Sequence, residues 1–101
     1  MNDKWNSANF STVMLMESNT ARIQFDLTME LPGPSQGDAY EHVERLGINP
    51  WLFEEIKPIA ETINGRMVTG TFEAIGNFQH VLDLAAATIH HRPSIDLPTP
   101  R

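Results

Sequence analysis

The clearest pattern in the chain is a strict alternation of apolar and polar residues over residues 22–31. The apolar positions are Ile23, Phe25, Leu27, Met29 and Leu31. Such an alternation is typical of a strand with one buried face and one solvated face. The run before it, residues 10–17, is rich in apolar and β-branched residues, and the turn-forming residues 18–20 separate the two runs. We therefore predict an N-terminal antiparallel hairpin.

Two helices are predicted in the middle of the chain. The first covers residues 39–46, with Asp38 and Glu41 in a capping-box pattern and Gly47 at the C-cap. The second begins at Asn49-Pro50, a capping side chain followed by proline. Its apolar residues recur at helical spacing and are Trp51, Leu52, Ile56, Ile59 and Ile63. Pro58 interrupts this pattern, so we expect a kink or two short helices, and residues 59–63 fit either helix or strand.

The last third of the chain predicts one more strand and one more helix. Asn64-Gly65 is a tight turn, and a strand over residues 66–72 would give the hairpin a third partner. Thr71 or Asn77 then caps a final helix, whose apolar stripe is Phe72, Ile75, Phe78, Leu82, Ala85 and Ile89. The predicted fold is α+β, a small antiparallel sheet packed against two or three helices in the order ββααβα.

The length of 101 residues indicates a single domain over residues 1–101. We expect residues 1–8 and 94–101 to be loose tails and residues 32–37 to link the hairpin to the helices. The chain contains no cysteine, which excludes disulfides and thiolate metal sites and favours a reducing compartment. It also lacks a secretory signal pattern and an apolar run of roughly 18 residues, so we expect a cytoplasmic protein with no membrane contact.

The formal net charge of −6 is concentrated in the middle of the chain. Residues 26–61 contain eight acidic and two basic residues, whereas the flanking segments are balanced. Direct nucleic-acid binding normally requires the opposite sign and is not expected. The candidate partner-binding residues are Asp38, Glu41, Glu44, Glu54 and Glu55. They are expected to form a continuous negative surface at two neighbouring helix starts; the alternative is a solvated surface that only maintains solubility.

No group of residues predicts a catalytic or metal site. Glu54 and Glu55 are placed in the first turn of a predicted helix, where acids are favoured without any catalytic role. Residues 65–71 loosely resemble a phosphate-binding loop but lack its lysine. Asp38 and His42 would share a helix face, yet zinc requires three or four converging ligands, so surface histidines are expected. We expect no enzyme activity and no cofactor or metal.

The methionines and Trp51 are also interpreted as core, and for the methionines the alternative is an adaptable binding surface. The methionines in question lie on predicted strands and are Met14, Met16, Met29 and Met67. Trp51 follows Pro50 and is also expected in the core, although aromatic anchors are enriched at the centres of interfaces.

The sequence favours a small acidic protein-binding domain of the inhibitor, immunity or adaptor type. It would act by occluding a basic site on a partner protein, including a site that normally binds nucleic acid. One alternative is an accessory or structural subunit that forms a homodimer, or docks on a larger enzyme, through its sheet edge and last helix. Another is a small-ligand or metal-binding domain with a pocket between sheet and helices.

Overall fold

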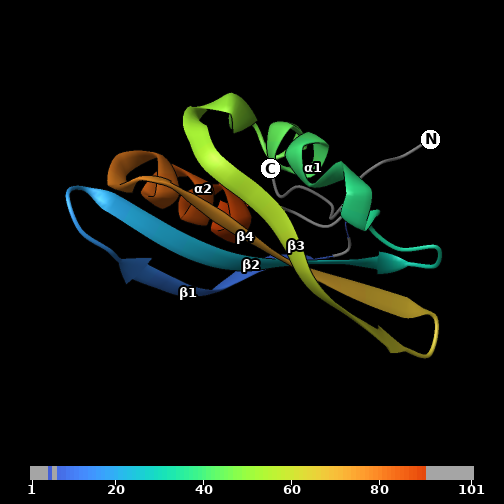
Figure 1. Cartoon of the computed structure of the whole chain (residues 1–101). Helices are drawn as coiled ribbons and strands as arrows, with labels where there is room; N and C mark the ends of the chain where they lie inside the picture. The colour runs from blue at the N-terminus through green and yellow to red at the C-terminus, as the bar shows by residue number, and fades with distance from the viewer. Residues whose placement is uncertain (1–4, 6, 91–101) are drawn as a thin grey trace, which may run out of the picture.

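The computed structural model describes Trp5 and residues 7–90. Its four strands form one antiparallel sheet in the order β1-β2-β4-β3, so that β1 and β3 are the edges (Figure 1). The elements in chain order are β1 (Ser7–Leu15), β2 (Thr20–Glu30), the 3-10 turn η1 (Gln36–Asp38), α1 (Ala39–Arg45), the 3-10 turn η2 (Pro50–Leu52), β3 (Phe53–Asn64), β4 (Met67–Asn77) and α2 (Phe78–His90).

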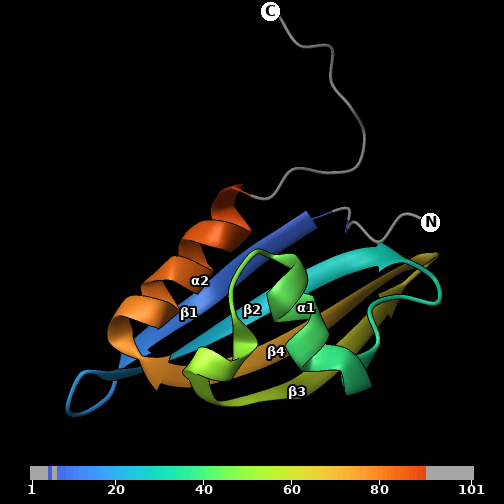
Figure 2. The same ribbon diagram turned by 90° about the horizontal axis from the view of Figure 1, so that it is seen from above.

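Both helices lie on one face of the sheet and leave the other face open (Figure 2). The helix α2 lies over β1 and β2, whereas α1 lies nearer to β3. The core fills the space between the helices and the central strands. Its fully buried large apolar side chains are Ile23, Phe25, Leu27, Val43, Val68, Phe72, Val81 and Leu84. Among the described residues, neither α1 nor α2 is long and apolar enough to span a bilayer.

The N-terminal hairpin is confirmed. The side chains of Ile23, Phe25 and Leu27 are completely buried, as their alternation predicted. Ser18 and Asn19 both have positive φ, which is the conformation that a tight turn between right-twisted strands requires. Phe25 on β2 pairs with Phe72 on β4, and their rings stack with centroids 5.6 Å apart. This pair joins the two central strands through the core.

The predicted small sheet in the order ββααβα is wrong, because the segment expected to form the second helix is the strand β3. Asn49 does cap the start, since its side-chain oxygen accepts a hydrogen bond from the backbone N–H of Trp51 at 3.0 Å. The helix that follows is only the single turn η2. From Phe53 the chain pairs with β4, which extends to Asn77, beyond the strand predicted over residues 66–72. The sheet therefore has four strands.

Irregular pairing explains why β3 has the apolar spacing of a helix. The register of β3 against β4 shifts at residues 53–55 and again at residues 58–60. Each shift inserts an extra residue and breaks the period of two. The residues of β3 opposite the helix-facing positions of β4 are Phe53, Ile56, Pro58, Glu61 and Ile63. The spacing imitates a helix because the extra residue at the second shift, Ile59, is also apolar and lies three residues after Ile56 and four before Ile63; residues 59–63 are strand.

The helix α1 begins close to the predicted residue, but its first turn is not capped as expected. Asp38 occupies the N-cap position, yet its side chain makes no capping hydrogen bond. The carboxylate of Glu41 instead accepts a hydrogen bond from Arg45, one turn later on the same helix. The acids of this segment consequently remain at the surface.

The end of α1 follows the prediction. Gly47 has a φ of +94°, a left-handed conformation that glycine adopts without strain. Its N–H donates to the carbonyl of Glu44 at 2.9 Å, and the N–H of Ile48 donates to the carbonyl of Val43 at 3.3 Å. These two bonds form a Schellman motif that turns the chain back toward the sheet. The segment leading into η2 is thereby held beside α1.

The last helix begins at Phe78, and Asn77 is its cap, accepting a hydrogen bond from the N–H of Gln79 at 2.8 Å. The alternative cap, Thr71, lies within β4. The predicted apolar stripe is displaced around the helix, since Leu82 and Ile89 are exposed. The residues of α2 that are buried are Val81, Leu84, Ala85 and Thr88. The predicted stripe is wrong in two respects, because Phe72 and Ile75 belong to β4 and the buried side of the helix is rotated away from Leu82 and Ile89.

The strand β1 begins at Ser7, within the expected loose lead-in, and Trp5 is buried. The other expected tail, residues 94–101, lies outside the described residues. The segment over residues 32–37 does connect the hairpin to α1, and its Pro34 is buried.

Candidate functional site

The five acidic candidates are all exposed, but they do not lie on one continuous surface. Asp38, Glu41 and Glu44 follow one another at intervals of three along η1 and α1, on the helix-covered side of the molecule. Glu54 and Glu55 lie on β3 rather than at the start of a helix. The side chain of Glu55 lies 4.0 Å from the ammonium of Lys57 and shares the open face of the sheet with it. The α1 acids are therefore grouped together, and Glu55 is separate from them.

Among the large hydrophobic residues that the structure describes, Trp51 is the most exposed, with 77% of its surface accessible. It was expected in the core. The position of its backbone is nevertheless well defined, because Pro50 before it is buried and Asn49 caps its N–H. The side chain stacks on Tyr40 of α1, with ring centroids 4.9 Å apart and planes inclined by 30°. An indole that rests on a partly buried tyrosine is thus presented to solvent.

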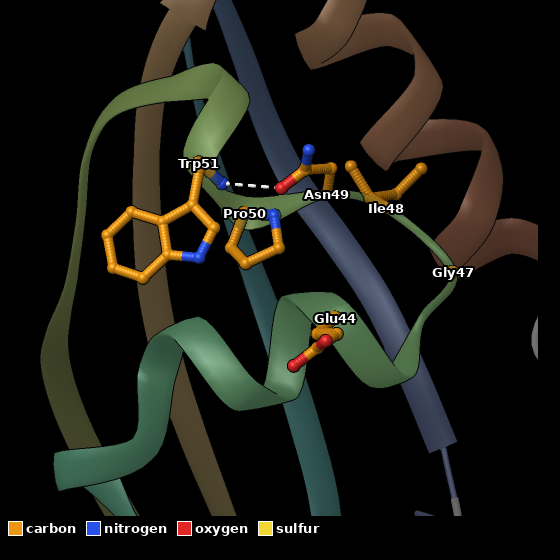
Figure 3. Close-up of a pocket in the computed structure, with 6 residues that line it drawn as sticks. All are labelled: Glu44, Gly47, Ile48, Asn49, Pro50 and Trp51. Carbon is orange, nitrogen blue, oxygen red and sulfur yellow. Dashed lines mark hydrogen bonds between the residues drawn. The ribbon is translucent and has the colours of Figure 1, made fainter.

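A groove of about 450 Å³ lies between α1 and the η2 segment. The residues that line it are Glu44, Gly47, Ile48, Asn49, Pro50 and Trp51. Figure 3 shows the rings of Trp51 and Pro50 on the η2 side and the carboxylate of Glu44 on the α1 side. The groove thus combines an apolar aromatic wall with a negative charge. Such a surface suits a cationic side chain, which stacks on the ring and pairs with the carboxylate.

The open face of the sheet is charged but locally neutralised. Glu73, at the centre of β4, is only 5% exposed and lies between two cations. Its carboxylate oxygens are 3.4 Å from Arg22 on β2 and 3.6 Å from Lys57 on β3. Asp26 on the same face accepts a hydrogen bond from the hydroxyl of Thr71 at 2.8 Å. Because these groups satisfy one another, they hold the strands together and leave little free charge.

His42 is buried rather than exposed as expected, with 4% of its surface accessible. Its Nε2 donates a hydrogen bond to the carbonyl of Ser35 at 2.8 Å, while its buried Nδ1 has no partner. The ring makes edge contacts with Trp5 and Phe72. Burial, which disfavours the charged form, lowers the pKa of His42 below 6.5, although the hydrogen bond to Ser35 opposes this effect. The neutral imidazole is therefore part of the core.

Within residues 7–90 and Trp5, no three histidine, aspartate or glutamate side chains converge as metal ligands. No family model, no curated protein and no solved structure matches the chain. The site is accordingly defined by its own geometry. For its main residue, Trp51, the sequence favours the core, with an aromatic interface anchor as the alternative, and the structure shows it exposed. The signal that could have identified it is Asn49-Pro50, which fixes the backbone of the next residue independently of the core.

Proposed function

We propose that this chain is a non-enzymatic protein-binding domain that docks on a basic surface of a partner through the groove between α1 and η2. The observation that carries the proposal is the exposure of Trp51 in a fixed conformation. An exposed indole contributes nothing to the core, and tryptophan is strongly enriched among the residues that dominate binding energy at interfaces. The stacking on Tyr40 and the cap from Asn49 reduce the conformational entropy that would be lost on binding.

The charge of the partner is inferred from the residues around the indole. Glu44 lines the groove, and Asp38 adds a second acid at the N-cap of α1, whereas the carboxylate of Glu41 is paired with Arg45. An arginine of the partner would stack its guanidinium on Trp51 and pair with the Glu44 carboxylate. Lysine would pair but would stack less well, since its ammonium is compact and more strongly hydrated. Arginine is therefore the preferred anchor on the partner.

The mode of action that fits this proposal is occlusion, as in inhibitors, immunity proteins and adaptors. A small acidic domain anchored on an arginine would cover a basic site of its partner, including one that otherwise binds nucleic acid phosphates. A cytoplasmic location is part of the same proposal, and fractionation of the host cells would test it. The cytoplasmic location would be contradicted if the chain were released from intact cells together with a periplasmic or secreted marker.

The proposal is tested by comparing the proteins retained from a host extract by the immobilised wild-type chain and by a Trp51→Ala variant. We expect the partner to be lost with Trp51→Ala and largely kept with Trp51→Phe, which retains an aromatic ring. Removing an interface anchor of this kind costs about 2–4 kcal/mol, so affinity for the purified partner should fall at least roughly thirtyfold. A partner that binds Trp51→Ala as tightly as the wild type would contradict the proposal.

Charge reversal separates a local contact from a general effect of net charge. The test variant is Glu41→Lys, Glu44→Lys, Glu54→Lys, in which two exposed acids of α1 and the exposed acid three residues after Trp51 are reversed. The matched control is Glu17→Lys, Glu30→Lys, Glu61→Lys, in which the same number of exposed acids elsewhere is reversed. We expect the first variant to lose binding and the control to bind more slowly but with a similar dissociation rate, since remote charges act mainly on encounter. Equal losses of binding in both variants would show that the groove acids have no special role.

A further inference from the structure

The two edges of the sheet differ in how they are protected from pairing with another strand. The edge strand β3 contains Pro58, two register shifts and several charged side chains, all of which discourage edge-to-edge pairing. The opposite edge, β1, contains neither proline nor any charged residue over Ser7–Leu15, and it has a single register shift at residues 10–12. Among the described strands, none pairs with the outer side of β1, and an edge strand without charges is a ready template for another strand.

An exposed apolar flank of α2 lies above this same edge. His80 makes an edge contact with the ring of Phe53 on β3, so its side of the helix faces the centre of the molecule. Leu82 lies two residues later, about 200° around the helix, and Ile89 lies seven residues beyond Leu82 on nearly the same side. Since α2 lies over β1 and β2 (Figure 2), this flank faces outward beyond β1.

Exposed apolar side chains occur at both ends of this edge, near the turn that joins β1 to β2 and in the last turn of α2. Leu15, at the end of β1, is 63% exposed, and Ile89 is 62% exposed. Phe10 and Val13 of β1 are only partly covered by the core. Several exposed apolar side chains along one uncharged sheet edge are typical of an interface, whereas single exposed apolar residues are common on any surface.

We propose that β1 and this flank of α2 bind a second copy of the same chain. The charge distribution favours a second copy of the chain over a basic partner at this surface. Two copies with a net charge of −6 repel each other unless they meet through uncharged surfaces. No charged residue occurs in β1, and Asp83 is the single Asp, Glu, Lys or Arg of α2. A basic partner would find no counter-charge on β1, whereas an identical copy would find a matching apolar surface.

The geometry of such a pair is self-consistent. Antiparallel pairing of β1 with β1 is compatible with a two-fold axis perpendicular to the sheet, which places both α2 helices on the same face. Their apolar flanks would then meet above the joined strands. The result is a continuous eight-stranded sheet whose two outer edges are both β3, the protected strand. This explains why one edge of the single chain carries protective features and the other does not.

Sedimentation velocity and light scattering over a range of concentrations test the proposal. We expect the wild type to approach twice the chain mass of 11.4 kDa. The test variant is Leu15→Lys, Ile89→Lys. Its matched control is Leu31→Lys, Ile63→Lys, in which the side chains are similarly exposed at 55% and 61% but lie away from β1. The test variant should dissociate roughly a hundredfold more readily than the control, because it brings like charges into an apolar contact.

Hydrogen exchange of the wild type provides a test that does not depend on any variant folding. The outward amides of β1 should become more protected as the protein concentration rises, while those of β3 should not. The proposal is overturned if the wild type keeps a mass of 11.4 kDa at all concentrations up to the solubility limit. It is equally overturned if the test variant dissociates no more than the control, or if β1 protection is independent of concentration. The Trp51→Ala variant should still dimerise, so this test is separate from that of the groove.

Discussion

Replacing Gly33 by alanine is expected to destabilise the fold far more than replacing Gly47, although both glycines have a similar positive φ. The φ values are +85° and +94°. An alanine in this left-handed conformation costs about 1–2 kcal/mol at either position. The difference comes from the surroundings. A Cβ on Gly33 would lie 2.5 Å from the Cβ of Val68, which is fully buried on β4, whereas a Cβ on Gly47 would meet no atom within 4 Å.

The steric conflict at Gly33 cannot be relieved by turning a flexible side chain, because all three nearest atoms belong to the branched side chain of Val68. Overpacking of this kind adds about 1–3 kcal/mol, so the total for Gly33→Ala is about 2–5 kcal/mol, against about 1–2 kcal/mol for Gly47→Ala. Urea unfolding followed by circular dichroism measures both free energies. Equal losses in the free energy of unfolding for the two variants would show that residues 32–37 do not pack closely against Val68 of β4, and would refute this account.

Two further predictions concern the core. Phe25→Ala should lower the free energy of unfolding by about 3–5 kcal/mol, because it removes a fully buried ring stacked on Phe72. Gln24→Ala, on the open face of the sheet, should lower it by well under 1 kcal/mol. Similar losses for the two variants in urea unfolding would contradict the assignment of the two faces. The free energy of unfolding should decrease as the pH falls below about 6.5, because the unfolded chain protonates His42 before the folded chain does, with a slope of at most about 1.4 kcal/mol per pH unit. A His42→Phe variant should lose this part of the pH dependence, and an unchanged slope would show that other groups cause it.

The parts of the fold that follow simple local rules could be predicted from the sequence. The alternation in β2, the left-handed position of Gly47 and the capping side chains of Asn49 and Asn77 each depend on a few neighbouring residues. The strand β3 could not be predicted in the same way, because its two register shifts arise from pairing with β4. They give inward residues such as Phe53 and Ile56 a spacing of three.

The candidate site was predicted only in part. The acids of η1 and α1 could be identified from their charge alone, because Glu41 and Glu44 are exposed whichever way the short helix packs on the sheet. The exposure of Trp51 depends on η2 ending after one turn, which sequence periodicity does not reveal. The orientation of α2 could not be predicted from periodicity either. Val81 and Leu82 are both apolar, and only the position of the sheet decides which of them is buried.

The strand order β1-β2-β4-β3 also determines the route by which the chain folds. The two outer pairings are hairpins whose strands are neighbours in sequence, so each closes a short loop and forms rapidly. The central pairing of β2 with β4 is different, because it must close the loop over residues 31–66. Loop closure of this length costs entropy before any contact compensates for it, and non-local pairings slow folding. We therefore expect two preformed hairpins to join along this seam in the slow step, with Phe25 meeting Phe72 as they join.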